Sequence, residues 1–178
     1  MDQGKKVIAG IVAATLMLLL GGVWLISNKQ KPPDKTALAP QSSYKKGATN
    51  GSAVLVEFGD FQCPACQKVQ PIIKQLLKDY PNDLTLVFRH FPLGQHRNSR
   101  LAATAAEAAG LQGKFWEMHD KLYETQGEWS ENPEPEKMFA SYATGLGLKV
   151  DQFTQDMKSE EVKKRIENDR KHELFRFC

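Results

Sequence analysis

Two cysteines separated by two residues are the part of this chain best suited to chemistry. Cys63 and Cys66 close the segment Phe-Gly-Asp-Phe-Gln-Cys-Pro-Ala-Cys, which begins at Phe58. Thiol–disulfide exchange needs an exposed nucleophilic thiolate and a resolving thiol within reach, and this spacing supplies both where it opens a helix. The sequence therefore predicts a redox pair, with Cys63 as the exposed thiol and Cys66 as the resolving thiol.

A strand and a helix are expected to hold this pair between them. The apolar, β-branched run from Ala53 to Phe58 predicts a strand buried on both faces except at Glu57. After the motif, apolar residues recur with the spacing of one helix face, which predicts a helix from Cys63 to Asp79, kinked at Pro71. The first turn of a helix has unpaired N–H groups and the positive end of the macrodipole, so it would stabilise a thiolate on Cys63.

The two residues between the cysteines agree with this placement. Pro64 fits the first helical turn, where its missing N–H costs nothing. Ala65 brings no charge and no hydrogen-bonding group, so stabilisation of the Cys63 thiolate falls to the helix terminus and the backbone.

A zinc site is the alternative interpretation, because the same cysteine spacing occurs among metal ligands. A closed structural site needs about four ligands. Only Cys178 remains, and the histidines His90, His96, His119 and His172 show no paired spacing. Redox chemistry is therefore favoured, and no metal or other cofactor is expected.

Three segments resemble the DsbA-like oxidoreductases of the thioredoxin fold, particularly the membrane-anchored bacterial kind related to BdbD. The first is Val-Glu-Phe-Gly-Asp-Phe-Gln-Cys-Pro-Ala-Cys, which includes Phe61. The others are Phe-Arg-His-Phe-Pro-Leu from Phe88 and Gly-Lys-Phe-Trp-Glu-Met-His ending at His119. The resemblance covers about Val54 to Arg170 and implies an α/β, thioredoxin-like fold with an inserted helical subdomain.

Glu57 is the third candidate catalytic residue. It lies six residues before Cys63, where the resembling enzymes carry a buried acid near the resolving cysteine. Desolvation would raise its pKa and let it exchange a proton with Cys66. The alternative is a solvated glutamate on the strand surface.

The remaining elements follow from the apolar pattern. Leu84 to Phe91 predicts a second strand, parallel to the first, and helices are expected near residues 101–109, 115–122, 139–146 and from 159 onward. His119 is expected in the core, whereas His90 and His96 are candidates for a loop or substrate rim. Trp116 and Trp129 are expected to serve packing.

The resemblance also predicts parts that the sequence does not contain. The family continues with a Thr-cis-Pro loop and a β-hairpin, but the last proline here is Pro135. We therefore expect an incomplete domain with two recognisable strands, which are marginal without further cover. Cys178 is an odd thiol that could capture Cys63 or Cys66 or link two molecules.

The N-terminal region predicts a membrane anchor. Val7 to Ile26 is twenty residues without a charge, long enough to cross a bilayer. The expected organisation is a cytoplasmic tail at 1–6, a transmembrane signal-anchor at 7–26, a flexible linker at 27–50 and the domain at 51–178. A cleaved signal peptide is the alternative, although its apolar core is usually shorter.

Localisation and partners follow from the same features. Disulfides persist outside the cytoplasm, so the domain is expected on the extracytoplasmic side of the cell membrane. The formal net charge of +3 with scattered lysines predicts no nucleic-acid binding.

The expected function is donation of disulfides to exported proteins, with a membrane redox partner that reoxidises Cys63 and Cys66. A reductase or isomerase of the same fold is one alternative. A truncated, non-catalytic remnant that needs a partner chain is the other.

Overall fold

The computed structural model describes residues 15, 17–18, 21 and 38–174, with side chains of the last range described as far as residue 171. The chain divides into the units Met1–Lys35 and Thr36–Cys178, and the second holds the fold. No helix among the described residues is long and apolar enough to cross a membrane. The predicted anchor at 7–26 lies almost wholly outside the described residues, as does Cys178.

A three-stranded sheet forms the centre of the second unit. Its strands are β1 (Tyr44–Gly47), β2 (Ala53–Gly59) and β3 (Leu84–His90), in the order β1-β3-β2. β3 pairs antiparallel with β1 and parallel with β2. Every residue of β3 is buried, as its apolar run and its central place require.

The structure corrects the sequence-based expectations in this region. β1 lies within 27–50, so the predicted linker is wrong over 44–47, and the expectation of two strands is also wrong. β2 is not buried on both faces, because it is an edge strand and Val54 is 55% exposed. The β1 segment Tyr-Lys-Lys-Gly has no apolar alternation, which is why its pairing could not be recognised from the sequence.

Seven helices are described in this unit. α3 (Pro64–Asp79) follows β2 and continues through Pro71 without interruption. The helices after β3 are α4 (Ser99–Leu111), α5 (Phe115–Glu124), α6 (Gln126–Trp129), α7 (Pro135–Gly145), α8 (Val150–Asp156) and α9 (Glu160–Leu174). The four predicted helical regions match α4, α5, α7 and α9, whereas α6 and α8 were not predicted.

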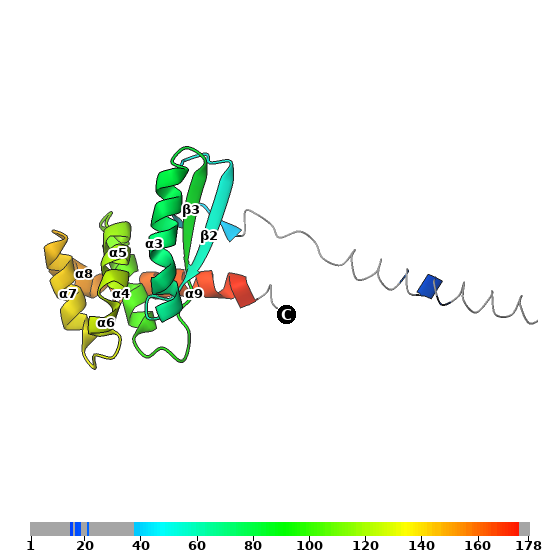
Figure 1. Cartoon of the computed structure of the whole chain (residues 1–178). Helices are drawn as coiled ribbons and strands as arrows, with labels where there is room; N and C mark the ends of the chain where they lie inside the picture. Colours follow the sequence, from blue (N-terminus) through cyan, green and yellow to red (C-terminus); the bar gives the residue numbers. More distant parts are fainter. Residues whose placement is uncertain (1–14, 16, 19–20, 22–37, 175–178) are drawn as a thin grey trace, which may run out of the picture. The chain divides into compact units, whose positions relative to one another are not determined.

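The helices α4 to α8 form a layer beside the sheet, and α3 lies along the sheet next to β3 (Figure 1). Buried aromatic and alanine side chains join this layer to the sheet. Phe61 stacks on Phe88 of β3, with ring centroids 5.3 Å apart, and Trp129 packs on Phe139. The alanines of α4 are almost fully buried, which lets neighbouring helices approach closely.

The last described helix, α9, is attached to the sheet by a buried ion pair. Arg89 of β3 is fully buried, and its Nε donates to Asp169 Oδ1 at 2.5 Å. The other oxygen of Asp169 accepts a hydrogen bond from the amide of His90 at 2.9 Å, two positions beyond Phe88, the last residue that β1 pairs. Asp169 thus satisfies a backbone donor where the strand pairing stops.

Candidate active site

The two cysteines lie at the junction of β2 and α3, as the sequence predicts. Cys63 is the N-cap residue of α3, and Cys66 lies within its first turn. Both are partly exposed and free, with no bond between their sulfur atoms. Pro64 occupies the start of the helix, where no N–H is required. Cys63 therefore stands at the positive end of the α3 dipole, next to unpaired amides.

Cys66 lies deeper than Cys63, and its side chain packs against the hydrophobic core. Burial raises the pKa of the Cys66 thiol to about 11. A hydrogen bond from the backbone of Asp60 opposes that change, while a hydrogen bond from the Cys66 thiol to Cys63 adds to it. Cys66 therefore holds its proton at neutral pH.

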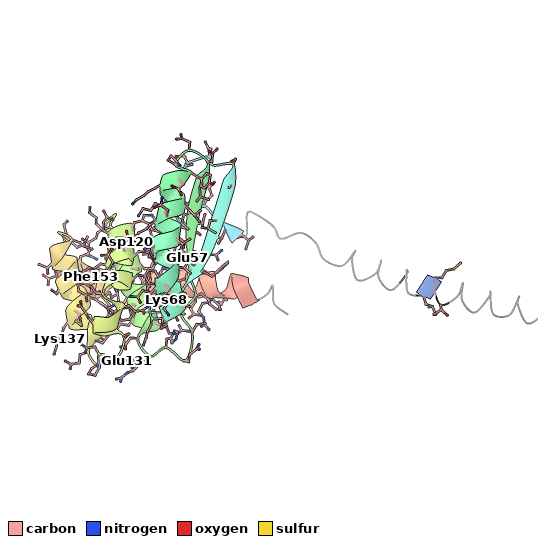
Figure 2. The ribbon with its side chains drawn as sticks, in the orientation of Figure 1. Glu57, Lys68, Asp120, Glu131, Lys137 and Phe153 are labelled. Atoms are coloured by element: carbon pink, nitrogen blue, oxygen red, sulfur yellow. The ribbon has the colours of Figure 1, made fainter. Side chains whose placement is uncertain are left out.

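Glu57 lies on β2 beside this pair and faces α3 (Figure 2). Gln70 of α3 donates from Nε2 to Glu57 Oε1 at 2.6 Å, and the same Nε2 reaches the carbonyl of Cys66 at 3.3 Å. Burial raises the pKa of Glu57 to about 7, although the Gln70 hydrogen bond opposes this change. The upward shift of the Glu57 pKa agrees with the expectation of a desolvated carboxyl rather than a solvated one.

Tyr123 of α5 closes the space above Glu57. Its hydroxyl lies 2.9 Å from the position that a Cβ would take at Gly59, two residues along β2 and on the same face as Glu57. Among the residues that the structure describes, neither the Tyr123 hydroxyl nor Glu57 Oε2 has a hydrogen-bond partner, although both are buried. Burial, followed by the charge of Glu57, raises the pKa of Tyr123 well above its ordinary value. Buried polar groups of this kind suit a bridging water molecule.

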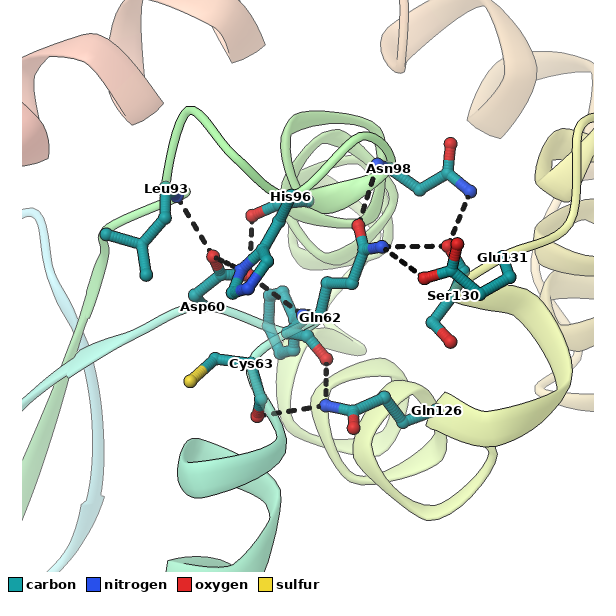
Figure 3. Close-up of polar contacts among 11 residues, drawn as sticks. Asp60, Gln62, Cys63, Leu93, His96, Asn98, Gln126, Ser130 and Glu131 are labelled. Atoms are coloured by element: carbon teal, nitrogen blue, oxygen red, sulfur yellow. Dashed lines mark hydrogen bonds and ion pairs between the residues drawn. The ribbon is translucent and has the colours of Figure 1, made fainter.

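Asp60 holds the loop before the cysteines in place. Its buried carboxylate accepts hydrogen bonds from the amides of Gln62 and Leu93 and from the Ser99 hydroxyl, at 2.8, 2.9 and 2.6 Å. His96 Nδ1 lies 2.6 Å from the same carboxylate. These contacts join the β2–α3 loop to the segment that follows β3 (Figure 3).

Two amide side chains attach the same loop to the helical layer. Gln126 donates from Nε2 to the carbonyls of Phe61 and Cys63, at 2.7 and 3.1 Å. Gln62 donates to the carbonyl of Ser130 at 2.8 Å and accepts the amide of Asn98 at 2.7 Å. Figure 3 shows these contacts around Cys63. The backbone on either side of the nucleophile is therefore fixed by side chains from distant segments.

The other residues singled out from the sequence occupy varied positions. Phe61 is buried against Phe88, and Ala65 is exposed beside Cys63. His119 is a buried core histidine with Nδ1 3.0 Å from Asp120 Oδ1, as expected. His96 contacts Asp60 in the cysteine loop, and its predicted place on a substrate rim stays a prediction.

His90 does not lie on that rim. It is 1% exposed within β3, and its Nε2 lies 3.0 Å from Glu107. A substrate-rim position for His90 is therefore wrong, because its side chain is buried against Glu107.

Sequence reasoning missed four positioning residues: Asp60, Gln62, Asn98 and Gln126. Asp60 and Gln62 stand within the motif, so a polar residue between apolar neighbours was an available signal. Asn98 and Gln126 gave no local signal, since only the fold brings them to Cys63. The part of the chain that the structure describes contains no group of three metal-ligating side chains.

The chemistry that this arrangement can perform is exchange between thiols and a disulfide. It combines an N-cap thiol, a deeper thiol with a raised pKa and a buried carboxyl whose pKa is about 7. Such a carboxyl can give and take a proton near neutral pH.

Known proteins of similar structure have the same fold. A thioredoxin-like oxidoreductase from Silicibacter pomeroyi superposes with a TM-score of 0.65 at 28% identity, covering 77% of this chain and 76% of that one. BdbD from Bacillus subtilis superposes with a TM-score of 0.67 at 23% identity, covering 80% of this chain and 77% of that one.

The curated relatives by sequence are much longer proteins. The Na(+)/H(+) antiporter NhaA 1 of Mycolicibacterium vanbaalenii is 35% identical over 181 aligned positions, which cover 94% of this chain and 28% of that protein. The chain thus spans less than a third of the length of that relative. The thioredoxin family model matches residues 41–174, which is most of the chain. The chain belongs to the thioredoxin family.

Proposed function

We propose that the chain is a thiol–disulfide oxidoreductase that works through Cys63 and Cys66. The observation that carries the proposal is the pair of free thiols in the first turn of α3, one at the N-cap and one packed against the core. The oxidoreductase from Silicibacter pomeroyi, with the same fold at 28% identity, supports it.

In the oxidising direction, a client thiolate attacks Cys63 Sγ of the Cys63–Cys66 disulfide. The sulfur–sulfur bond breaks, Cys66 leaves as a thiolate, and Glu57 gives it a proton. A second client thiolate then attacks the client sulfur of the mixed disulfide, which forms the client disulfide and releases Cys63 as a thiolate. The client loses two electrons, and the cysteine pair gains them.

Donation of disulfides is the preferred direction. A thiolate on Cys63 lies at the positive end of α3, which stabilises the reduced form and makes the disulfide a stronger oxidant. A reductase or isomerase is the alternative. A reduction potential near the value of roughly −270 mV that thioredoxin has would favour that alternative.

The proposed setting is the outer side of a cell membrane, with the chain anchored through Val7 to Ile26. The support is the uncharged length of that segment and the persistence of disulfides outside the cytoplasm. Exported proteins with cysteines would be the clients, and a membrane redox partner would reoxidise the pair.

The test is oxidation of a reduced, unfolded protein by the full chain, next to the Cys63→Ser variant. We expect disulfide formation with the native chain and none above the uncatalysed rate with the variant. Equal rates for the two would reject the proposal. The variant Cys66→Ser should trap mixed disulfides with clients, visible on non-reducing gels.

A non-catalytic module that depends on additional strands is the second candidate. It is favoured by the exposed edge strand β2 with Val54, and separately by Val69 and Ile72 of α3, which are 44% and 59% exposed. Exposed edges of this kind are normally covered. A chain that folds and binds reduced clients but forms no disulfides in them would support this second candidate.

A further inference from the structure

A groove of about 820 Å³ lies among α4, α7, α8 and α9, and neither Cys63 nor Cys66 is among its lining residues. Its floor is apolar and includes Met157 and Ile166, which are buried, together with Leu101 and Ala140. Ligand pockets in proteins commonly measure about 300–1,000 Å³. The groove can therefore accept several apolar side chains of a bound segment.

The rim of the groove is basic. Its cations come from the start of α4, the start of α7 and the region where α8 connects to α9. They are Arg97, Arg100, Lys137, Lys158 and Lys163. Glu136 is the only acid among the lining residues. The rim thus attracts carboxylates.

Some of these cations already have partners. Ion pairs join Arg100 to Glu167, Lys137 to Glu134 and Lys163 to Glu160, and all three are at the surface. Exposed pairs contribute little stability, so a ligand carboxylate can join or replace them. Within the described residues, neither Arg97 nor Lys158 has an acidic partner at ion-pair distance.

The groove also lies close to the cysteine loop. Arg97 directly precedes Asn98, whose amide donates to Gln62 Oε1 at 2.7 Å, and Gln62 directly precedes Cys63. One hydrogen bond therefore separates the segment that carries Arg97 from the loop that carries the nucleophile. The end of the groove that Arg97 lines is therefore the end nearest to Cys63.

We propose that this groove binds the client polypeptide and selects segments in which apolar and acidic residues accompany the cysteine. The inference rests on the proposed function, because it names the clients of Cys63. Cations on separate helices suit a ligand with several spaced carboxylates better than an amphiphile with one charged head group. The apolar floor suits the side chains between those carboxylates.

The test compares two synthetic dithiol peptides that differ only in charge. Both carry two cysteines and several leucines, and one has glutamates where the other has lysines. The oxidised full chain reacts with each at low salt, and the ratio of the two rate constants is measured. We expect the glutamate peptide to react roughly tenfold faster, within the range of electrostatic steering, and the ratio to fall as salt is added.

The double variant Arg97→Glu and Lys158→Glu should reverse this ratio. Both side chains are exposed, so the fold should tolerate the changes. The double variant Lys164→Glu and Lys171→Glu is the matched control, since it makes the same charge change at exposed positions of α9 outside the groove and should keep the native preference. Because each chain is compared with itself, a general change in reactivity cancels from the ratio.

Failure of this inference and failure of the proposed function give different results. If the native chain oxidises dithiothreitol through Cys63 but shows no preference between the peptides, the groove does not select clients. If Cys63 oxidises neither dithiothreitol nor peptide, the proposed function fails. If peptides with serine in place of cysteine do not bind while oleate binds with the charge dependence expected here, the groove is an amphiphile site and the inference is overturned.

Discussion

At the scale of single residues, the candidate site depends on a difference in environment between groups that lie close together. Cys63 stands at a helix terminus, whereas Cys66 and Glu57 lie deeper, where burial raises the pKa of both. Desolvation disfavours the charged form of thiols and carboxyls alike. In the proposed mechanism, Cys66 and Glu57 would exchange a proton while Cys63 reacts with the client.

Glu57 makes the stability of the protein depend on pH. Burial raises its folded-state pKa to about 7 from an ordinary value of 4.5, so the folded state keeps this proton where the unfolded state has lost it. The contribution of protonated Glu57 to the free energy of unfolding is complete below pH 4.5 and is lost as the pH rises to about 7.

We expect the free energy of unfolding of the native chain to fall by about 3 kcal/mol across this range relative to the Glu57→Gln variant. Urea unfolding of both proteins at the two ends of the range measures the difference. A constant difference between the two proteins would show that Glu57 titrates as a solvated carboxyl.

At the scale of elements, the strand β1 and the short helix α6 set the geometry around the site. β1 covers one edge of β3, and its Tyr44 stacks on Phe115 of α5 with ring centroids 3.6 Å apart. α6 carries Gln126, which donates hydrogen bonds to the carbonyls of Phe61 and Cys63. Neither element was predicted from the sequence.

Gly110 of α4 provides the space that Tyr44 fills. A Cβ at Gly110 would overlap the phenol ring of Tyr44, so the ring and β1 would have to move. We expect Gly110→Ala to destabilise the protein by about 1–3 kcal/mol, the usual cost of overpacking, despite its better helix propensity.

Gly127 of α6 is the matched control, because nothing lies within 4 Å of its Cβ position. Gly127→Ala should leave stability unchanged or raise it by up to about 1 kcal/mol. Thermal and urea unfolding of the two variants test this prediction. Equal effects would mean that Tyr44 does not pack against Gly110.

Gln126 is expected to matter through the carbonyls that it satisfies. Gln126→Leu leaves the carbonyls of Phe61 and Cys63 without this donor, and we expect a loss of about 1–3 kcal/mol in the free energy of unfolding. Gln155→Leu, at an exposed position of α8, should change it by less than about 0.5 kcal/mol. The prediction fails if the two substitutions cost the same in urea unfolding.

At the scale of the whole molecule, α9 returns from the helical layer and binds the sheet through charge. Arg89 and Asp169 form the central pair, and the neighbouring Glu107 accepts from the Tyr44 hydroxyl at 3.1 Å and lies 3.0 Å from His90 Nε2. Burial alone would raise the pKa of Glu107, but the hydrogen bond with His90 and nearby positive charges lower it. This cluster joins β1, β3, α4 and α9.

Asp169→Asn should be strongly destabilising, because it removes the carboxylate opposite a fully buried guanidinium. Breaking one side of a buried pair typically costs about 3–5 kcal/mol, and we expect a loss near the lower end. Glu167 lies on α9, like Asp169, and forms an exposed ion pair with Arg100 of α4. Glu167→Gln breaks this pair and should cost less than about 1 kcal/mol. Similar losses for both would show that the Arg89 pair is not buried in solution.

The sequence by itself determined where the cysteine pair lies and which strand and helix flank it. The Cys63–Cys66 spacing, the apolar run before it and the helical repeat after it are local patterns, so they could be interpreted without the fold. Glu57 was also recognised from its place in an apolar strand. Local spacing is enough where a strand and the following helix are adjacent in the chain.

Only the tertiary structure decided which distant residues support the cysteines and which strand lies at the open edge. Asn98 and Gln126 reach the loop across 36 and 63 positions of sequence, and β1 pairs with β3 without an apolar pattern of its own. Such contacts depend on backbone groups and on packing between separate elements. They cannot be predicted from a local sequence pattern, because the contacting residues come together only when the chain folds.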